Sequence, residues 1–345
     1  MSVSFSIIIP VYNEVDIIEK FVDKLQKTFG HLKVKYIFVD DGSKDGSKNW
    51  LENNLQKFID KNNYELILLN KNKGKGFAVR KGIEKIQGNY TIFIDSDLEY
   101  NPVDALELYN IVNENKNKKI KVLFGSRYIG GKLQLRRHFF NDIAVRLNTW
   151  IFNILFNQSI TDLHSGTKII ENKLLKSLNL TLNGFGHEID ISSQISSKKI
   201  NIYETGISYI ERSFEEGKKI TIIDGILSYY FLFKARFLQN DKYTTVSMIY
   251  SLIVMTFIGT FFGMGIGKIM ITVVFSFVGL VNAMHRKIFT LSIIFLFIYL
   301  GSLFSNGNGR IVPILLFYVF SLWLTKKIIK NIKKIDKNSF LNYFI

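Results

Sequence analysis

Residues 90–100 read YTIFIDSDLEY, an apolar segment suited to a β-strand that runs directly into two carboxylates. Asp95 and Asp97 are separated by one serine, and side chains at positions i and i+2 of an extended segment point the same way. Two carboxylates held together repel each other unless a cation lies between them. Mg²⁺ or Mn²⁺ suits such a pair, because these ions take oxygen ligands and share them with substrate phosphates. The alternative is a solvated turn before Asn101-Pro102, but the position after a strand favours the metal site.

The segments around this strand alternate between two kinds of pattern. Strand-like runs occupy residues 6–11, 35–40, 65–70, 89–95 and 121–126, and helix-length stretches occupy residues 16–29, 47–62, 76–87 and 103–115. Such alternation predicts an α/β fold with a mostly parallel sheet and helices on both faces. Ligands of these sheets bind beyond the carboxyl ends of the strands.

Two further polar motifs follow predicted strands. Asp40 and Asp41 follow the second strand in VDDGSKDGS, where they could accept hydrogen bonds from a base or a ribose or cap the next helix. The stretch NKNKGKGFAVRKG at 70–82 places glycines and basic residues before a helix, which suits anion binding at a helix N-terminus. It matches neither the P-loop nor the dinucleotide-binding pattern, which argues against both of those classes.

Composition limits the protein class. The 345 residues contain no cysteine, so disulfides and thiolate sites are excluded. The net charge of +16 predicts attraction to anions: nucleic acid, phosphorylated substrates or an acidic membrane face. The N-terminus lacks a basic region and a long apolar run, so we expect no signal peptide.

The character of the chain changes near residue 244. Four charge-free runs follow, at residues 244–267, 269–284, 288–304 and 311–325. Four such runs in succession predict about four transmembrane helices within 244–330, although three of them are at or just below the usual minimum length. Two long hairpins are the weaker alternative.

Basic residues predict the orientation of these spans. Eleven of them flank one side, including the tail at 331–345, whereas Lys268 and Arg310 flank the other. The positive-inside rule therefore places the N-terminal half, residues 1–221, and the tail in the cytoplasm of a multi-pass membrane protein. The linker at 222–243 begins IIDGILSYYFLFKARF, which predicts an amphipathic helix in the membrane interface; an ordinary core helix is the alternative.

Ordered motifs carry a family resemblance. The segments SIIIPVYNE, VDDGSKDGS, NKGKGFAVRKGI, IDSDLEYNP and GSRYIGG resemble glycosyltransferase family 2 over roughly residues 4–240. Within that family the chain resembles the polyprenyl-phosphate (dolichyl-phosphate) sugar synthases, which implies a GT-A fold, a nucleotide-sugar donor, Mg²⁺ or Mn²⁺, and a polyprenyl phosphate acceptor. It implies no nucleic-acid partner.

The resemblance also implies roles for individual residues. It assigns the nucleotide pocket to Pro10, Tyr12, Glu14, Asp40, Asp41 and Asp95, the metal to Asp95, Asp97 and Glu99, and catalysis to Asp97, Arg127 and Arg212. It assigns the acceptor phosphate to Arg137, Arg212 and Lys218. In GFGHEID, Glu188 and Asp190 are candidate sugar or acceptor ligands, or simply first-turn acids of a helix.

Three positions depart from the family pattern. Glu215 and Gly217 replace the usual glycine and serine, which puts the role of Lys218 in doubt, and Asn141 stands where many relatives have a serine. His164 and His187 are too far apart in sequence to indicate a metal site.

Several functional hypotheses remain open at this stage. The leading one is an inverting transfer of a hexose from GDP-mannose or UDP-glucose to polyprenyl phosphate at the cytoplasmic face of the membrane. A lipid monophosphate is already largely ionised at neutral pH, so no general base is expected. The alternatives are a glycolipid or polysaccharide acceptor, a non-catalytic membrane scaffold, and an added lipid-flipping role, for which the spans contain no polar pathway. The spans could also mediate homo-oligomer formation.

Overall fold

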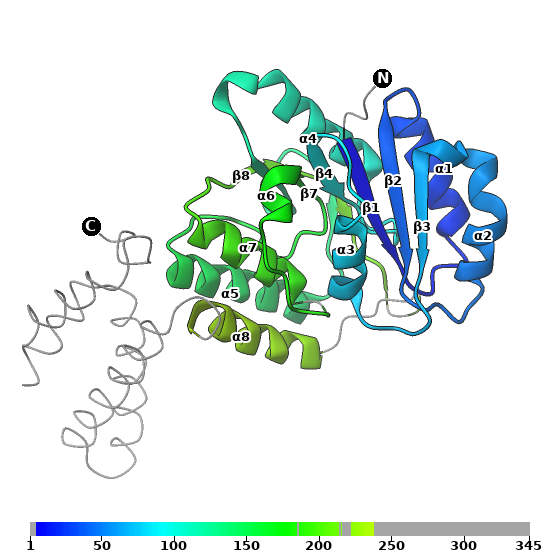
Figure 1. Ribbon diagram of the computed structural model, residues 1–345. Helices are drawn as coiled ribbons and strands as arrows, with labels where there is room; N and C mark the ends of the chain where they lie inside the picture. The colour runs from blue at the N-terminus through cyan, green and yellow to red at the C-terminus, as the bar shows by residue number, and fades with distance from the viewer. Residues whose placement is uncertain (1–4, 185, 214, 216–221, 238–345) are drawn as a thin grey trace, which may run out of the picture. The chain divides into compact units, whose positions relative to one another are not determined.

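The computed structural model describes residues 5–184, 186–213, 215 and 222–237 (Figure 1). All of the site described below lies in one compact unit, Met1–Ala235. The predicted spans at 244–330, the tail at 331–345, the end of the 222–243 linker and Lys218 lie outside the described residues. Among the helices that are described, none has the length and apolar character needed to cross a membrane.

The centre of the fold is a seven-stranded sheet with the strand order β3-β2-β1-β4-β7-β5-β8. Its strands are β1 (Phe5–Val11), β2 (Val34–Asp40), β3 (Tyr64–Leu68), β4 (Tyr90–Phe93), β5 (Val122–Ser126), β7 (Lys168–Glu171) and β8 (Tyr203–Gly206). All neighbours are parallel except β7, which runs antiparallel to both β4 and β5. The prediction of a mostly parallel sheet is therefore confirmed.

Helices cover both faces of the sheet, as predicted (Figure 1). They are α1 (Ile18–Phe29), α2 (Ser47–Phe58), α3 (Lys75–Ile83), α4 (Pro102–Glu114), α5 (Phe139–Phe156), α6 (Asn172–Lys176), α7 (His187–Ser197) and α8 (Ile222–Phe237). Alternate residues of β1 enter opposite cores, because successive side chains of a strand point to opposite faces. Ile7 and Ile9 pack with α1, α2 and α4, and Ile8 packs with α3, α6 and α7.

A third apolar cluster joins α5, α7 and α8. Phe152 and Phe156 of α5 pack against Ile189 of α7 and against Leu232 and Ala235 of α8. Burial of this set stabilises the position of α8, since each fully buried apolar side chain contributes roughly 1.5–3 kcal/mol.

The outer faces of α5 and α8 remain apolar. The large hydrophobic side chains exposed there are Phe139, Phe140, Ile143, Leu147, Trp150, Leu227, Tyr230 and Phe233. We call this set the apolar face. The described part of the predicted linker, Ile222–Phe237, is thus a helix with one packed side and one exposed apolar side.

A small second sheet closes the fold near the carboxyl ends of the main strands. Strands β6 (Gln134–Leu135) and β9 (Tyr209–Ile210) pair in parallel, and Tyr100 forms an isolated bridge with Tyr209. This pairing brings the segment that contains Arg212 next to the segment that follows β4.

Candidate active site

The carboxyl ends of four parallel strands meet at one pocket, as the α/β pattern predicted. Tyr12 follows β1, Asp41 follows β2, Asp95 follows β4 and Arg127 follows β5, and all four line a cavity of about 800 Å³. The walls on the other side come from α5, α8 and the N-terminal end of α7. The volume is in the range of pockets that hold a whole small-molecule ligand.

Most of the predicted nucleotide-binding residues line this pocket. Pro10, Tyr12, Glu14 and Asp41 do so. The Asp41 carboxylate accepts backbone hydrogen bonds from Lys73 and Gly74, both 2.8 Å long, which ties the loop before α3 to the end of β2. Burial raises the pKa of Asp41 above its usual value.

Asp40 is not among the residues that line the pocket, so its predicted role beside the nucleotide stays a prediction. It is fully buried, and its Oδ2 accepts hydrogen bonds from the backbone of Gly42 and Ser43. The alternative interpretation, a turn stabilised by an aspartate side chain, describes Asp40.

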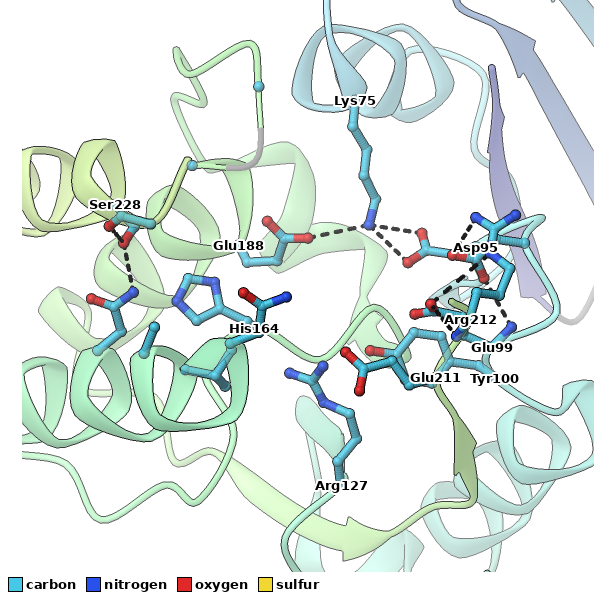
Figure 2. A pocket seen from close by; sticks show the side chains of 18 of the residues that line it. Lys75, Asp95, Glu99, Tyr100, Arg127, His164, Glu188, Glu211, Arg212 and Ser228 are labelled. Carbon is cyan, nitrogen blue, oxygen red and sulfur yellow. Dashed lines mark hydrogen bonds and ion pairs between the residues drawn. The ribbon is translucent and has the colours of Figure 1, made fainter. Parts of the chain in front are cut away.

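Four acidic residues crowd one end of the pocket. Asp95, Asp97, Glu99 and Glu14 all line it, and two cations lie among them (Figure 2). The nearest guanidinium nitrogen of Arg212 lies 2.9 Å from the Glu14 carboxylate. The corresponding distances are 3.5 Å to the Asp97 carboxylate and 4.0 Å to the Glu99 carboxylate. Arg212 therefore lines the pocket, with carboxylates as its partners.

Asp97 experiences this crowding most strongly. Burial, together with the charges of Glu99 and Asp95, raises its pKa to about 7. A divalent cation would relieve this repulsion, so Asp95 and Asp97 fit the predicted metal as ligands.

Glu99 is a weaker candidate for the metal. One of its oxygens accepts a 2.9 Å hydrogen bond from the Tyr209 hydroxyl, and the other accepts a 3.0 Å bond from the Arg212 backbone. Across the described part of the chain, no group of three or more His, Cys, Asp or Glu residues is placed to hold a metal ion. The role of Glu99 in metal binding stays a prediction that these hydrogen bonds oppose.

Lys75 is a site residue whose individual role the sequence did not indicate. From the first position of α3 its Nζ lies 2.8 Å from the Asp95 carboxylate and 3.2 Å from Glu188 (Figure 2). Burial opposes its charge, but Asp95 and Glu188 outweigh burial and raise the pKa of Lys75 above its usual value. The motif that was predicted to bind an anion therefore supplies a cation to the pocket. This cation comes from the first residue of α3 and not from the loop before the helix.

Arg127 lines the pocket in an ion pair with Asp162. Its Nε and Nη2 donate to the two oxygens of Asp162 at 2.7 and 2.8 Å, and its guanidinium lies over the Tyr209 ring. Asp162 is fully buried, so the pair fixes the direction of Arg127 into the pocket (Figure 2).

The predicted role of Arg137 at the acceptor phosphate stays a prediction. Its Nε donates to the backbone oxygen of Glu211, and Arg137 does not line the pocket. The preceding residue, Arg136, lines it instead, between Asp142 and the Tyr128 ring. A pair of adjacent arginines cannot be told apart by sequence when the strand that orients them, β6, is two residues long.

The GFGHEID motif divides into one pocket residue and one structural residue. Glu188 lines the pocket. Asp190 does not: its oxygens accept hydrogen bonds from the backbone of Thr181 and Leu182 and from Gln194. These bonds favour the alternative given for Asp190, a structural acid in the first turn of α7, because the carboxylate holds the loop before that helix.

The sequence comparisons decide the family. The family model described as glycosyl transferase family 2 matches residues 6–178, half of the chain. The chain belongs to this family. The assignment agrees with the motif resemblance, since the matched region includes β1 to β7 and the carboxylates at 95–99.

Three similar proteins match part of the chain. An uncharacterized protein from Methanocaldococcus jannaschii is 30% identical over 58% of this chain and 86% of its own length. A dolichyl-phosphate beta-glucosyltransferase from Dictyostelium discoideum is 25% identical over 58% of this chain and 64% of its own. An undecaprenyl-phosphate 4-deoxy-4-formamido-L-arabinose transferase from Proteus mirabilis is 32% identical, but the match covers 33% of this chain and 37% of that enzyme.

A solved structure supports the fold. Glucosyl-3-phosphoglycerate synthase from Mycobacterium tuberculosis, crystallised with UDP, superimposes with a TM-score of 0.52 over 70% of this chain and 82% of that one. The two sequences are 16% identical. The similarity therefore establishes the glycosyltransferase architecture and no finer property of this family member.

Proposed function

We propose that this protein transfers a hexose from a nucleotide sugar, GDP-mannose or UDP-glucose, to a polyprenyl phosphate at the cytoplasmic face of a membrane. One observation carries the proposal. A single pocket is lined on one side by the acidic residues expected to bind the nucleotide and the metal, and on the other by α5 and α8, whose outer sides form the apolar face. Two relatives named above act on dolichyl or undecaprenyl phosphate, which supports the same acceptor class.

The two ends of the pocket suit the two substrates. Tyr12, Glu14 and Asp41 would contact the nucleoside, and Asp95 and Asp97 would hold Mg²⁺ or Mn²⁺. When bound, the metal would neutralise the diphosphate and stabilise its departure. At the opposite end Phe140, which lines the pocket and is 82% exposed, would contact the lipid chain.

The reaction needs positive charge more than a base. An oxygen of the acceptor phosphate would bond to the anomeric carbon while the bond from that carbon to the diphosphate oxygen breaks. The electron pair of that bond leaves with the nucleoside diphosphate, and the configuration inverts. The acceptor is already anionic, so the protein must hold two anions together. Lys75, Arg127, Arg136 and Arg212 are the cations that line the pocket.

Membrane attachment belongs to the same proposal. The apolar face would lie in the headgroup region, and the predicted spans after residue 243 would anchor the enzyme. Such attachment would bring the mouth of the pocket to the level at which a polyprenyl phosphate presents its headgroup.

Product formation tests the proposal. The full-length protein in detergent or liposomes would be incubated with polyprenyl phosphate, Mg²⁺ or Mn²⁺ and a panel of labelled GDP- and UDP-sugars. We expect one donor to give a lipid-soluble, mild-acid-labile product, and Asp97→Asn to lose it while still folding. Near-normal turnover by Asp97→Asn would remove the basis for the metal site.

A further inference from the structure

Asn148 presents a buried hydrogen-bond acceptor beside the pocket. It lies on α5, is 3% exposed, and donates through its Nδ2 to the hydroxyl oxygen of Ser228 on α8. Ser228 itself donates to the backbone oxygen of Gly225, so its hydroxyl proton is used and its oxygen must accept. This fixes the amide of Asn148, and its Oδ1 has no hydrogen-bond partner among the described residues.

His164 presents a second buried polar atom in the same pocket. The backbone of Leu163 donates to the Thr149 hydroxyl, which ties the residue before His164 to the residue after Asn148 on α5. His164 lines the pocket, and its Nε2 is buried without a hydrogen-bond partner in the described part of the chain. Burial lowers the pKa of His164 to about 4, so the imidazole is neutral at pH 7 and can donate or accept.

Glu188 completes the group from α7. Burial alone would raise its pKa, but His187 and Lys75 hold the pKa of Glu188 well below its usual range, so it is a carboxylate. Glu188 lies between Lys75 and His164, on the side of Lys75 away from Glu99 (Figure 2).

We propose that Glu188, His164 and Asn148 form the binding site for the hexose of the donor, and that His164 is a residue that determines which hexose is accepted. The three groups offer a carboxylate, a neutral imidazole and an amide oxygen. Sugar hydroxyls donate and accept, so they match this set.

A phosphate does not match the same set. Buried acceptors such as Glu188 and the Asn148 oxygen would repel an anion, and Arg127 and Arg212 are already paired with Asp162 and Glu14. We therefore assign the acceptor phosphate to Arg127 and Arg212, and the neutral hexose to the group that contains Glu188. This inference rests on the proposed function, because it names the part of the donor that the site recognises.

Deoxy-sugar donors give the sharpest test. Binding of the nucleoside diphosphate, of the intact nucleotide sugar and of analogues lacking one hydroxyl each would be measured on the full-length protein in detergent. The proteins compared would be wild type, His164→Ala and His164→Gln. His31→Ala is the matched control, since His31 is an exposed histidine outside the pocket.

We expect His164→Ala to bind the nucleoside diphosphate like wild type and the intact sugar donor about tenfold more weakly, the loss of one hydrogen bond. One deoxy analogue should bind wild type about tenfold more weakly yet bind His164→Ala no worse than the intact donor does. His164→Gln, which keeps a hydrogen-bonding group, should recover part of the affinity.

Each other outcome has a definite meaning. If every deoxy analogue loses the same affinity with wild type and with His164→Ala, His164 does not contact the sugar and the inference fails while the proposed function stands. If His164→Ala weakens the binding of the nucleoside diphosphate as much as the binding of the nucleotide sugar, the effect of the substitution is structural. The inference then fails in the same way. If wild type binds no nucleotide sugar, the proposed function fails and the inference with it.

Discussion

Lys75 and Asp95 form a partly buried ion pair, with the Lys75 Nζ at 2.8 Å from the Asp95 carboxylate. The same Nζ lies 3.2 Å from Glu188, so one lysine joins the residue that follows β4 to the N-terminal end of α7. In the proposed reaction this cation lies between the diphosphate and the hexose. That position makes it a candidate to stabilise the departing charge.

Replacing Lys75 should therefore impair turnover. Lys75→Met keeps most of the length and removes the charge, and we expect kcat/KM to fall by about 10²-fold, as when one preorganised donor to developing charge is lost. Lys81→Met is the control, because Lys81 lies on the same helix and pairs with the exposed Glu84. Equal activity of the two variants would show that the Lys75 charge does not act in the reaction.

The buried Arg127–Asp162 pair should dominate local stability. Asp162→Ala leaves a buried guanidinium without its partner, which typically costs about 3–5 kcal/mol. The exposed pair between Lys27 and Asp23 provides the comparison, and Asp23→Ala should change stability by about 1 kcal/mol or less. Denaturant unfolding measures both. A small effect of Asp162→Ala would mean that Arg127 finds another partner in the pocket.

His164 should make the stability of the protein depend on pH. The groups whose charges act on it are Glu188, Asp162, Arg127 and Lys168, and burial still lowers the pKa of His164 to about 4. The unfolded chain, with a histidine pKa near ~6.5, binds the proton first. The neutral ring is thus favourable to folding above ~6.5, and this contribution falls as the pH drops toward about 4.

The comparison of wild type with His164→Gln isolates this effect. The difference in unfolding free energy should shift against wild type by up to about 1.4 kcal/mol for each pH unit between pH 6.5 and 4, and stay level above pH 7. Thermal and denaturant unfolding across that range measure it. A difference that does not change with pH would show that His164 titrates normally in the folded protein.

The apolar face should set the affinity for the lipid acceptor. Phe139 and Phe140 begin α5 and are 70% and 82% exposed. Replacing both by serine should raise KM for polyprenyl phosphate in liposomes by roughly tenfold or more and leave KM for the donor unchanged, because each buried phenylalanine contributes roughly 1.5–3 kcal/mol. Val103→Ser, an exposed apolar residue on α4, is the control. An unchanged KM for polyprenyl phosphate would show that the apolar face does not contribute to binding the lipid acceptor.

The sequence predicted the parts of the site that follow from strand order. Asp41, Asp95 and Arg127 each come within two residues of the end of a β-strand. The pattern of strands in the sequence was therefore enough to predict that they lie at one edge of the sheet. Arg136, Asn148 and His164 were missed because they reach the pocket through tertiary packing: a two-residue strand orients Arg136, and the α5–α8 contact fixes Asn148. For Asp190 the sequence left a ligand and a first-turn acid open, since both share one sequence pattern.

The strand β7 illustrates the same limit for the fold. It enters the sheet antiparallel between β4 and β5, from a point more than forty residues after β5 in the chain. Local patterns identify strands, whereas their order depends on long-range contacts that no single segment encodes.

The central claim is that the acceptor is a phosphate that needs no general base, and one comparison tests it most directly. The full-length protein with its preferred donor would be offered polyprenyl phosphate and, in parallel, the matching polyprenol without the phosphate. We expect product from the phosphate alone. Comparable transfer to the free alcohol would contradict it, because the pocket would then have to supply the base that the proposed mechanism leaves out.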